Sequence, residues 1–278
     1  MKMFRRVRAM IAFSYAMGHL VCITFPGFLM GAIISALTCR GNAVVFRNRF
    51  SWWTTMHGAF MFILMQRLLG VRGRFHSPLE IPHTHSFIVI ANHQSVIDIP
   101  LVCYILWMMD RTALRWVLKE DLRWTPFGMA GMLTHCAFVI RKKETSEQDR
   151  ASVAKCGDDA LKDGASVILF PEGTRFKGAE PESGFSCLRR PKQGGFKELL
   201  HQMPGVGVLA ITLRWDGGER GQGFGRTIWD TLDFVGRDLD VSVEYVSRTE
   251  VDADPDWMNN QWRTMDVALS HQEGDATT

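Results

Sequence analysis

This chain lacks several patterns that mark common classes of protein. Its six Cys residues form no CxxC pair and no Cys/His spacing that suits zinc, so we expect reduced, mostly buried thiols and no metal. The net charge is only +3, and no basic block is dense enough to indicate nucleic-acid binding. Internal repeats and low-complexity linkers are also missing. A chain of 278 residues nevertheless allows one large or two small domains with an ample core.

The amino-terminal part is rich in long apolar runs. Four basic residues within the first eight positions precede residues 9–39, which contain no charged residue. A run of that length can span a bilayer, which needs about 20 apolar residues, and its basic flank would stay in the cytoplasm. A second apolar run covers residues 52–69. The first run is too long, and has no small-residue cleavage pattern, for a signal peptide.

Two arrangements of these runs are open: two membrane spans, or a hairpin that dips into one leaflet. Pro26-Gly27 favours a break in the first run, and the basic connector between the runs opposes translocation. Both arrangements leave the rest of the chain on the cytoplasmic face of a membrane, the inner membrane if the source is bacterial. We therefore divide the chain into anchoring helices (1–70), a globular domain (71–270) and a flexible tail (271–278).

The globular part alternates between strand and helix patterns. Such alternation predicts an α/β fold with a largely parallel sheet flanked by helices. The expected strands are 86–91, 113–118, 136–140, 166–170 and 206–213, with a weaker one at 241–246. The expected helices are 96–109, 146–162, 193–202 and 256–270.

Two polar clusters, 92–98 and 170–175, directly follow two of these strands. Ligands bind outside the carboxyl ends of parallel strands, so both clusters should meet at one edge of the sheet. Within the first cluster, an Asp98 carboxylate bonded to one imidazole nitrogen of His93 would leave the other nitrogen free to take a proton. The same stretch also fits a capping box from Ser95 to Asp98, which is a purely structural alternative.

No GxSxG elbow is present to supply a serine nucleophile. A His–Asp pair without a nucleophile favours direct activation of a hydroxyl that the substrate brings. We therefore expect His93 and Asp98 to be the catalytic residues, acting without a covalent enzyme intermediate.

Cations stand at or near the ends of three expected strands: Lys119, Arg141 and Arg175. Arg binds phosphate in a bidentate fork and Lys binds it as a point charge, so this grouping indicates an anionic substrate. Alternatively, each cation marks only the place where a buried strand reaches water. In the second cluster, Gly173 allows close approach of the backbone to a ligand. Thr174 adds a hydroxyl, and Glu172 could position the acceptor or Arg175.

Together these residues resemble the glycerolipid acyltransferase family, which includes 1-acyl-glycerol-3-phosphate acyltransferases. The NHxxxxD pattern is intact from Asn92 to Asp98, and FPEGTR is intact at 170–175. The stretches 119–122 and 138–141 are similar to the family's intervening block. The resemblance covers roughly residues 85–215.

The resemblance implies transfer of a fatty acyl group from acyl-CoA or acyl-carrier protein to the free hydroxyl of lysophosphatidate, giving phosphatidate. His93 would be the general base and Asp98 its orienting partner. No cofactor or metal is implied; the partners are a lysophospholipid acceptor, an acyl thioester donor and the bilayer. The implied substrate-binding residues are Lys119, Arg141, Glu172, Gly173, Thr174 and Arg175.

Three other functions stay open at this point. Within the same class, the acceptor could be another lysophospholipid. A lipid hydrolase would use His93 to activate water, and a non-catalytic membrane module would need neither His93 nor Asp98. The basic segment 184–195 could bind a headgroup or be a solvated face.

Overall fold

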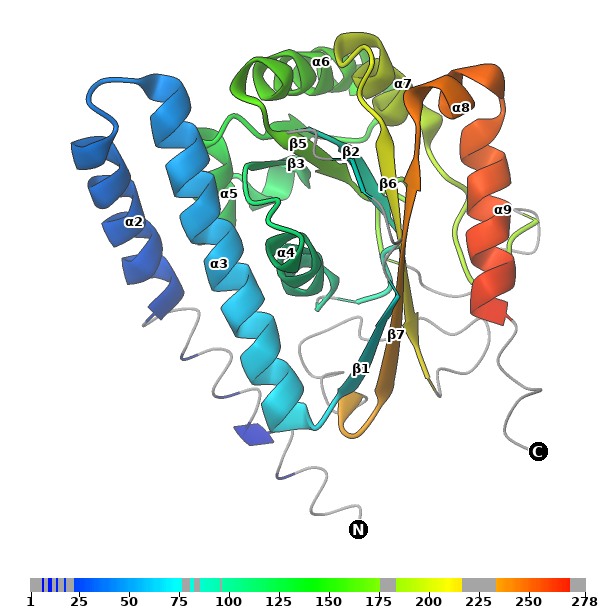
Figure 1. Cartoon of the computed structure of the whole chain (residues 1–278), viewed down its shortest axis with the longest axis horizontal. Helices are drawn as coiled ribbons and strands as arrows, with labels where there is room; N and C mark the ends of the chain where they lie inside the picture. The colour runs from blue at the N-terminus through cyan, green and yellow to red at the C-terminus, as the bar shows by residue number, and fades with distance from the viewer. Residues whose placement is uncertain are drawn as a thin grey trace.

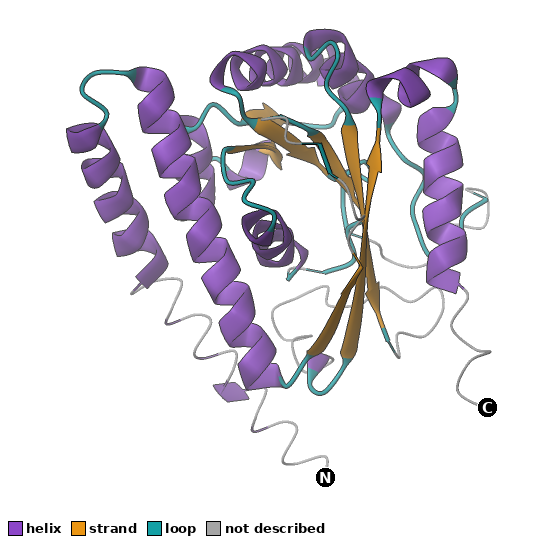
Figure 2. Cartoon of the chain, in the orientation of Figure 1, coloured by secondary structure: helices purple, strands orange, loops and turns teal. Residues whose placement is uncertain are grey.

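The computed structural model describes residues 23–76, 81–82, 86–95, 97–175, 184–216 and 234–270, with five isolated positions before residue 19. Within these residues, helices pack on both faces of a seven-stranded sheet (Figures 1 and 2). The order of strands across the sheet is β1-β7-β6-β2-β5-β3-β4. The strands are β1 (Arg72–His76), β2 (Ile88–Ala91), β3 (Leu114–Lys119), β4 (Ala137–Val139), β5 (Ser166–Leu169), β6 (Val208–Trp215) and β7 (Asp238–Val246).

The prediction of a largely parallel sheet is confirmed. Strands β6, β2, β5, β3 and β4 run parallel to one another, and β6 pairs antiparallel with β7 on its other side. Sequence patterns missed β1, which pairs parallel with β7 at the edge of the sheet. Its sequence, RGRFH, contains one apolar residue and therefore gives no apolar pattern. Besides the strand pairing, side-chain contacts from Arg72 to Asp238 and from His76 to Asp240 join it to β7.

The helices lie before, between and after the strands. The expected helices 96–109, 146–162, 193–202 and 256–270 are present within a few residues of their predicted bounds. The α-helices are α2 (Phe25–Thr38), α3 (Ala43–Leu69), α4 (Asp98–Met108), α5 (Pro126–Leu133), α6 (Ser146–Asp163), α7 (Gln193–Gln202), α8 (Arg248–Ala253) and α9 (Trp257–Ser270). Two short 3-10 helices are η2 (Glu120–Leu122) and η3 (Lys143–Thr145).

Two hydrophobic cores lie on the two faces of the sheet. Because side chains alternate along a strand, β2 supplies Val89 to one core and Ile88 to the other. The first core joins the sheet to α3 and α4, and the second joins it to α6, α7, α8 and α9. Figure 1 shows α3 and α4 on one side of the sheet and α9 on the other. The active-site edge is therefore held between two packed layers.

The amino-terminal helices differ from the expected anchor. Within the described residues, no helix is both long and apolar enough to cross a membrane, so the expected spanning segment finds no support there. Helix α3 instead contributes Phe62, Met65 and Leu69 to the first core. Helix α2 starts at Phe25, which puts Pro26 in its first turn, where the missing N–H breaks no helical hydrogen bond. The two residues before α2, Ile23 and Thr24, are π-helical, so the chain changes helix type next to the break expected at residues 26–27.

A buried ion cluster ties α3 to the sheet. The carboxylate of Asp163, at the end of α6, accepts from Arg47 Nε over 2.7 Å and from Arg115 Nη2 over 2.8 Å. Arg115 on β3 is fully buried. Asn48 adds a bond from its side-chain amide to the Asp163 carbonyl. Three elements distant in sequence are therefore joined by one carboxylate.

The predicted tail, 271–278, lies outside the described residues.

Candidate active site

The two sequence clusters meet at the carboxyl edge of the sheet. Strands β2 and β5 are parallel neighbours, so the turns that follow them lie side by side. The buried side chain of Asn92 fixes the end of β2 to β6, because its amide donates to the Leu213 carbonyl (2.9 Å) and accepts from the Leu213 N–H (2.7 Å). This pair replaces the strand hydrogen bonds where β2 turns away. The predicted convergence of the clusters is present in the structure.

His93 and Asp98 form the expected pair. The distance between His93 Nδ1 and Asp98 Oδ2 is 2.9 Å, and the Asp98 side chain is fully buried. The imidazole stacks on the Phe170 ring, with centroids 4.3 Å apart and planes inclined by 19°. Binding of Nδ1 by the carboxylate sets the tautomer and leaves Nε2 as the nitrogen that can accept a proton. The side chain has the geometry of a held general base.

Asp98 also organises the backbone of the turn that precedes α4. Its Oδ2 atom also accepts from the backbone N–H groups of Gln94 and Ser95, each over 2.7 Å. The expected capping box is not formed: the N-cap of α4 is Ile97, without a side-chain cap, and the Ser95 hydroxyl accepts from the Ile97 N–H over 2.9 Å and not from that of Asp98. The carboxylate therefore folds the 92–98 turn around itself while it holds the imidazole.

Glu172 lies between the two clusters and is only 1% exposed. Its Oε1 atom accepts from the His93 N–H (2.7 Å), and its Oε2 atom accepts from the Arg189 N–H (3.0 Å). Burial raises the pKa of this carboxyl to about 8, although both backbone donors favour its charged form. The sequence suggested that Glu172 positions the acceptor or Arg175. In the structure its carboxyl group binds the backbone N–H groups of His93 and Arg189 and is closed to solvent.

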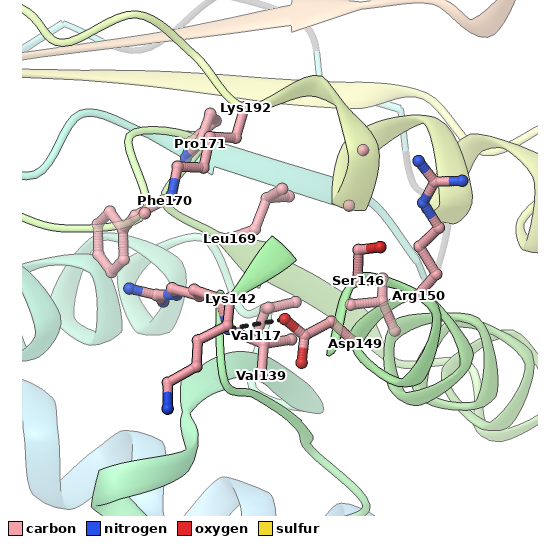
Figure 3. A pocket seen from close by; sticks show the side chains of 15 residues that line it. Val117, Val139, Lys142, Ser146, Asp149, Arg150, Leu169, Phe170, Pro171 and Lys192 are labelled. Atoms are coloured by element: carbon pink, nitrogen blue, oxygen red, sulfur yellow. Dashed lines mark hydrogen bonds between the residues drawn. The ribbon is translucent and has the colours of Figure 1, made fainter. Parts of the chain in front are cut away.

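A pocket of about 340 Å³ opens beside the pair (Figure 3). Phe170 connects the pocket to the His93–Asp98 pair, because its ring stacks on His93 and the residue also lines the pocket. The floor is apolar and is formed by strand ends and α6. Its apolar side chains are Val117, Val139, Val153, Leu169 and Phe170.

Four cations line the same pocket: Arg141, Lys142, Arg150 and Lys192. They come from three places in the chain, namely the turn after β4, helix α6 and the residue before α7. Figure 3 shows Arg150 rising from α6 toward the beginning of α7, with Lys192 above Pro171. The lining includes one acidic residue, Asp149, whose two oxygens accept from the N–H groups of Ile140 and Arg141 (2.8 and 2.7 Å). The pocket is therefore strongly positive.

Arg141 is held in this pocket by its backbone. It has a φ of 66°, a left-handed conformation that the Asp149 carboxylate stabilises through its bonds to the adjacent N–H groups. Burial lowers the pKa of its guanidinium, which Asp149 and Asp121 partly oppose. A partly desolvated cation of this kind gains from binding an anion.

The other predicted binding residues are placed differently. Gly173 lines the pocket, with a φ of 72° and its α-carbon facing the Lys192 side chain. Thr174 and Arg175 follow it and are half-buried, outside the pocket lining. Lys119 is exposed at the end of β3, where it pairs with Asp121, and it does not line the pocket. The structure thus brings Arg141 and Gly173 together and leaves Lys119 apart.

Sequence reasoning missed three of the four pocket cations. Lys142 follows Arg141 directly, so the strand-end argument could have included it. Lys192 lies in the basic segment 184–195, for which headgroup binding was one of two interpretations. Nothing in the sequence singles out Arg150, because its place in the pocket depends on how α6 packs against the sheet.

The class of this protein is given by a family match, which places it among the acyltransferases. The family model described as "Acyltransferase" matches residues 72–214, and the chain belongs to that family. The resemblance to glycerolipid acyltransferases, and the prediction of an enzyme of that kind, are confirmed.

A search of solved structures finds the crystal structure of PlsC, the 1-acyl-sn-glycerophosphate (LPA) acyltransferase of Thermotoga maritima. The two chains are 18% identical, with a TM-score of 0.61, over 99% of this chain and 100% of the other. At this identity the likeness shows a shared fold. No curated protein matches the chain.

Proposed function

We propose that this enzyme transfers a fatty acyl group from acyl-CoA or acyl-carrier protein to the free hydroxyl of lysophosphatidate, giving phosphatidate. The observation that carries the proposal is the four-cation pocket that begins at Phe170, beside the His93 base. A phosphate in that pocket would hold a glycerol hydroxyl near the imidazole. Positioning of this kind is a large part of the catalysis of a bimolecular transfer.

The proposed reaction is a single displacement at the thioester. His93 Nε2 removes the proton from the acceptor hydroxyl as its oxygen attacks the thioester carbonyl carbon. The carbon–sulfur bond then breaks, and the departing thiolate takes the proton from the imidazolium. Buried Asp98 keeps the imidazole in the required tautomer and stabilises its charged form. No enzyme nucleophile enters the reaction.

The charge of the pocket favours lysophosphatidate over other lysophospholipids. A phosphomonoester carries between one and two negative charges at neutral pH, whereas the phosphodiester of other lysophospholipids carries one. Four cations and one carboxylate line the pocket. An excess of positive charge in a partly buried site supports binding of the dianion more than binding of the monoanion.

The test of the base is acyl transfer by purified enzyme in detergent, with each donor and with lysophosphatidate. We expect His93→Ala to lose at least ~10²–10⁴-fold in kcat. Equal product from the wild type and His93→Ala would overturn the mechanism. Release of free fatty acid without consumption of acceptor would indicate a hydrolase instead.

The test of the acceptor compares lysophosphatidate with lysophosphatidylcholine and lysophosphatidylethanolamine. Arg150→Gln and Lys192→Gln should each raise the KM for lysophosphatidate ~10-fold, as expected for loss of one charged hydrogen bond. Lys155→Gln is the matched control, since Lys155 is exposed on the same helix as Arg150. Preference for a diester acceptor that survives these changes would favour the rival acceptor.

We also propose that the enzyme acts at a membrane, with its catalytic domain on the cytoplasmic face. Support comes from α2, whose Phe28, Gly31 and Ser35 are buried while its opposite side is apolar and exposed. A contiguous apolar surface of this kind is typical of lipid contact. The exposed side chains are Phe25, Leu29, Met30, Ile33, Ile34 and Leu37.

Flotation with phosphatidylglycerol–phosphatidylcholine vesicles tests this contact. Ile33→Asp should reduce the bound fraction several-fold, because a charge would have to enter the interface. Val267→Asp on α9 is the control: Ile33 and Val267 are 52% and 51% exposed, and their helices, α2 and α9, lie on opposite sides of the molecule (Figure 1). Equal loss in both variants would remove the role of α2.

A further inference from the structure

Residues 186–192, here called the docked segment, connect the carboxyl-terminal helix to the active site. The segment contains Lys192 of the pocket, and its Leu188 is fully buried. The segment is anchored at Leu188, while Ser186, Arg190 and Lys192 are exposed. Helix α9, against which it lies, is outside the residues 72–214 that match the family.

Helix α9 holds the docked segment through hydrogen bonds to backbone. The largely buried Asp266 carboxylate accepts from three consecutive N–H groups, those of Ser186, Cys187 and Leu188, over 2.9, 2.7 and 2.9 Å. One turn earlier, the fully buried Trp262 indole donates to the Arg189 carbonyl over 2.9 Å.

The other side of the same segment contacts the catalytic motifs. The Arg189 N–H donates to Glu172, and the other oxygen of Glu172 accepts from the His93 N–H. The Lys192 N–H donates to the Pro171 carbonyl over 2.8 Å. Arg189 is thus bound through its carbonyl to α9 and through its N–H to the carboxylate that holds His93.

We infer that Trp262 and Asp266 are positioning residues of the active site, which act on the His93 base through the docked segment and Glu172. Each link is a hydrogen bond between groups that are buried or half-buried, so it is shielded from competing water. One oxygen of Glu172 binds the Arg189 N–H and the other binds the His93 N–H. A shift of Arg189 would therefore be transmitted to the His93 backbone. Misplacement of a reacting group by about 1 Å can cost ~10²-fold in rate.

Trp262→Phe tests this relay with little change in shape, because it removes the indole N–H and keeps an aromatic ring. We expect kcat for lysophosphatidate acylation to fall ~3–30-fold, the range between one lost hydrogen bond and a misplaced base. The matched control is Trp257→Phe in the same helix, whose indole stacks on Phe196 and has no hydrogen bond within the described residues. That control should keep kcat within about 2-fold.

A double-mutant cycle separates a relay from general loosening of the fold. In a Glu172→Ala background, which removes both acceptor oxygens and so breaks the link, Trp262→Phe should cost at most ~2-fold more. Losses that multiply in the double variant, or equal losses in Trp262→Phe and Trp257→Phe, would overturn the inference. Asp266→Asn provides a second entry to the same relay if Trp262→Phe folds poorly, and its control is the exposed Asp252→Asn on α8.

The inference rests on the proposed function, and its failure can be told apart from failure of that function. A wild-type enzyme that does not acylate lysophosphatidate, or a fully active His93→Ala, would remove the proposed function. Loss of activity in His93→Ala together with full activity in both Trp262→Phe and Asp266→Asn would remove the relay alone.

Discussion

The carboxylate of Glu172, after β5, accepts a hydrogen bond from the backbone N–H of His93, after β2, over 2.7 Å. The two sequence motifs of this acyltransferase are therefore one structural unit. The FPEGTR turn binds the backbone of the NHxxxxD turn through Glu172, and Asp98 binds the imidazole itself. The histidine is fixed at two points by two buried carboxyl groups, and each can be tested separately.

The buried carboxyl of Glu172 should make stability depend on pH. The pKa of this group is raised by burial from 4.5 to about 8, so the folded protein keeps a proton that the unfolded chain has released between those values. The free energy of unfolding should therefore fall, by about 3–5 kcal/mol, as the pH rises from 4.5 through 8.

Glu172→Gln lacks this titration. Denaturant unfolding of both proteins at several pH values should show the wild type losing stability relative to the variant as the pH rises. Parallel curves for the two proteins would contradict the assignment.

Asp98→Asn should lower kcat by ~10²–10⁴-fold. In the wild type, one oxygen, Asp98 Oδ2, accepts from the imidazole and from two backbone N–H groups. An amide nitrogen at that position could accept none of these bonds. The substitution also removes the negative charge that stabilises the imidazolium. Asp110→Asn, exposed just beyond the other end of α4, is the matched control. Initial rates at saturating substrate decide; similar kcat values for the two variants would exclude the orienting role of Asp98.

Gly173→Ala should weaken binding of the phosphorylated acceptor. A methyl group there would lie 3.3 Å from Lys192 Cδ, and the φ of 72° costs a non-glycine residue about 1–2 kcal/mol. Gly205→Ala controls for that strain, since Gly205 has a φ of 75° with nothing within 4 Å of the added carbon. Both variants should lose similar stability, but only Gly173→Ala should raise KM, by ~3–10-fold. A KM that rises equally in both would separate Gly173 from the pocket.

Asp163→Asn should destabilise the fold by about 3–5 kcal/mol, because it leaves the buried Arg115 guanidinium without its counter-charge. Burial alone would raise the pKa of Asp163, but its hydrogen bonds from Arg47 and Arg115 lower it, so the carboxylate is charged at neutral pH. Asp158→Asn, on the same helix, removes only a surface pair with Lys162 and should cost less than about 0.5 kcal/mol. Equal midpoints of denaturation for the two variants would refute this account.

Much of the sheet could be predicted because its central strands are buried on both faces and are therefore continuously apolar. The runs at 86–91 and 166–170 stand out for this reason, and they contain β2 and β5. Edge strand β1 has no such pattern, since its position depends on the backbone of β7. The apolar run at 52–69 predicts a membrane helix, yet α3 places residues such as Phe62 in the core. Composition alone does not distinguish an apolar helix against protein from one against lipid.

The sequence by itself determined the family and the candidate catalytic pair, because the NHxxxxD and FPEGTR motifs are local patterns that directly follow two apolar runs. The tertiary structure decided the rest. The bond from Glu172 to the His93 N–H joins residues 79 apart, and that from Asp266 to Leu188 joins residues 78 apart. Arg150 enters the pocket only because α6 packs beneath the strand ends. Such contacts depend on how distant elements pack, and no local spacing encodes them.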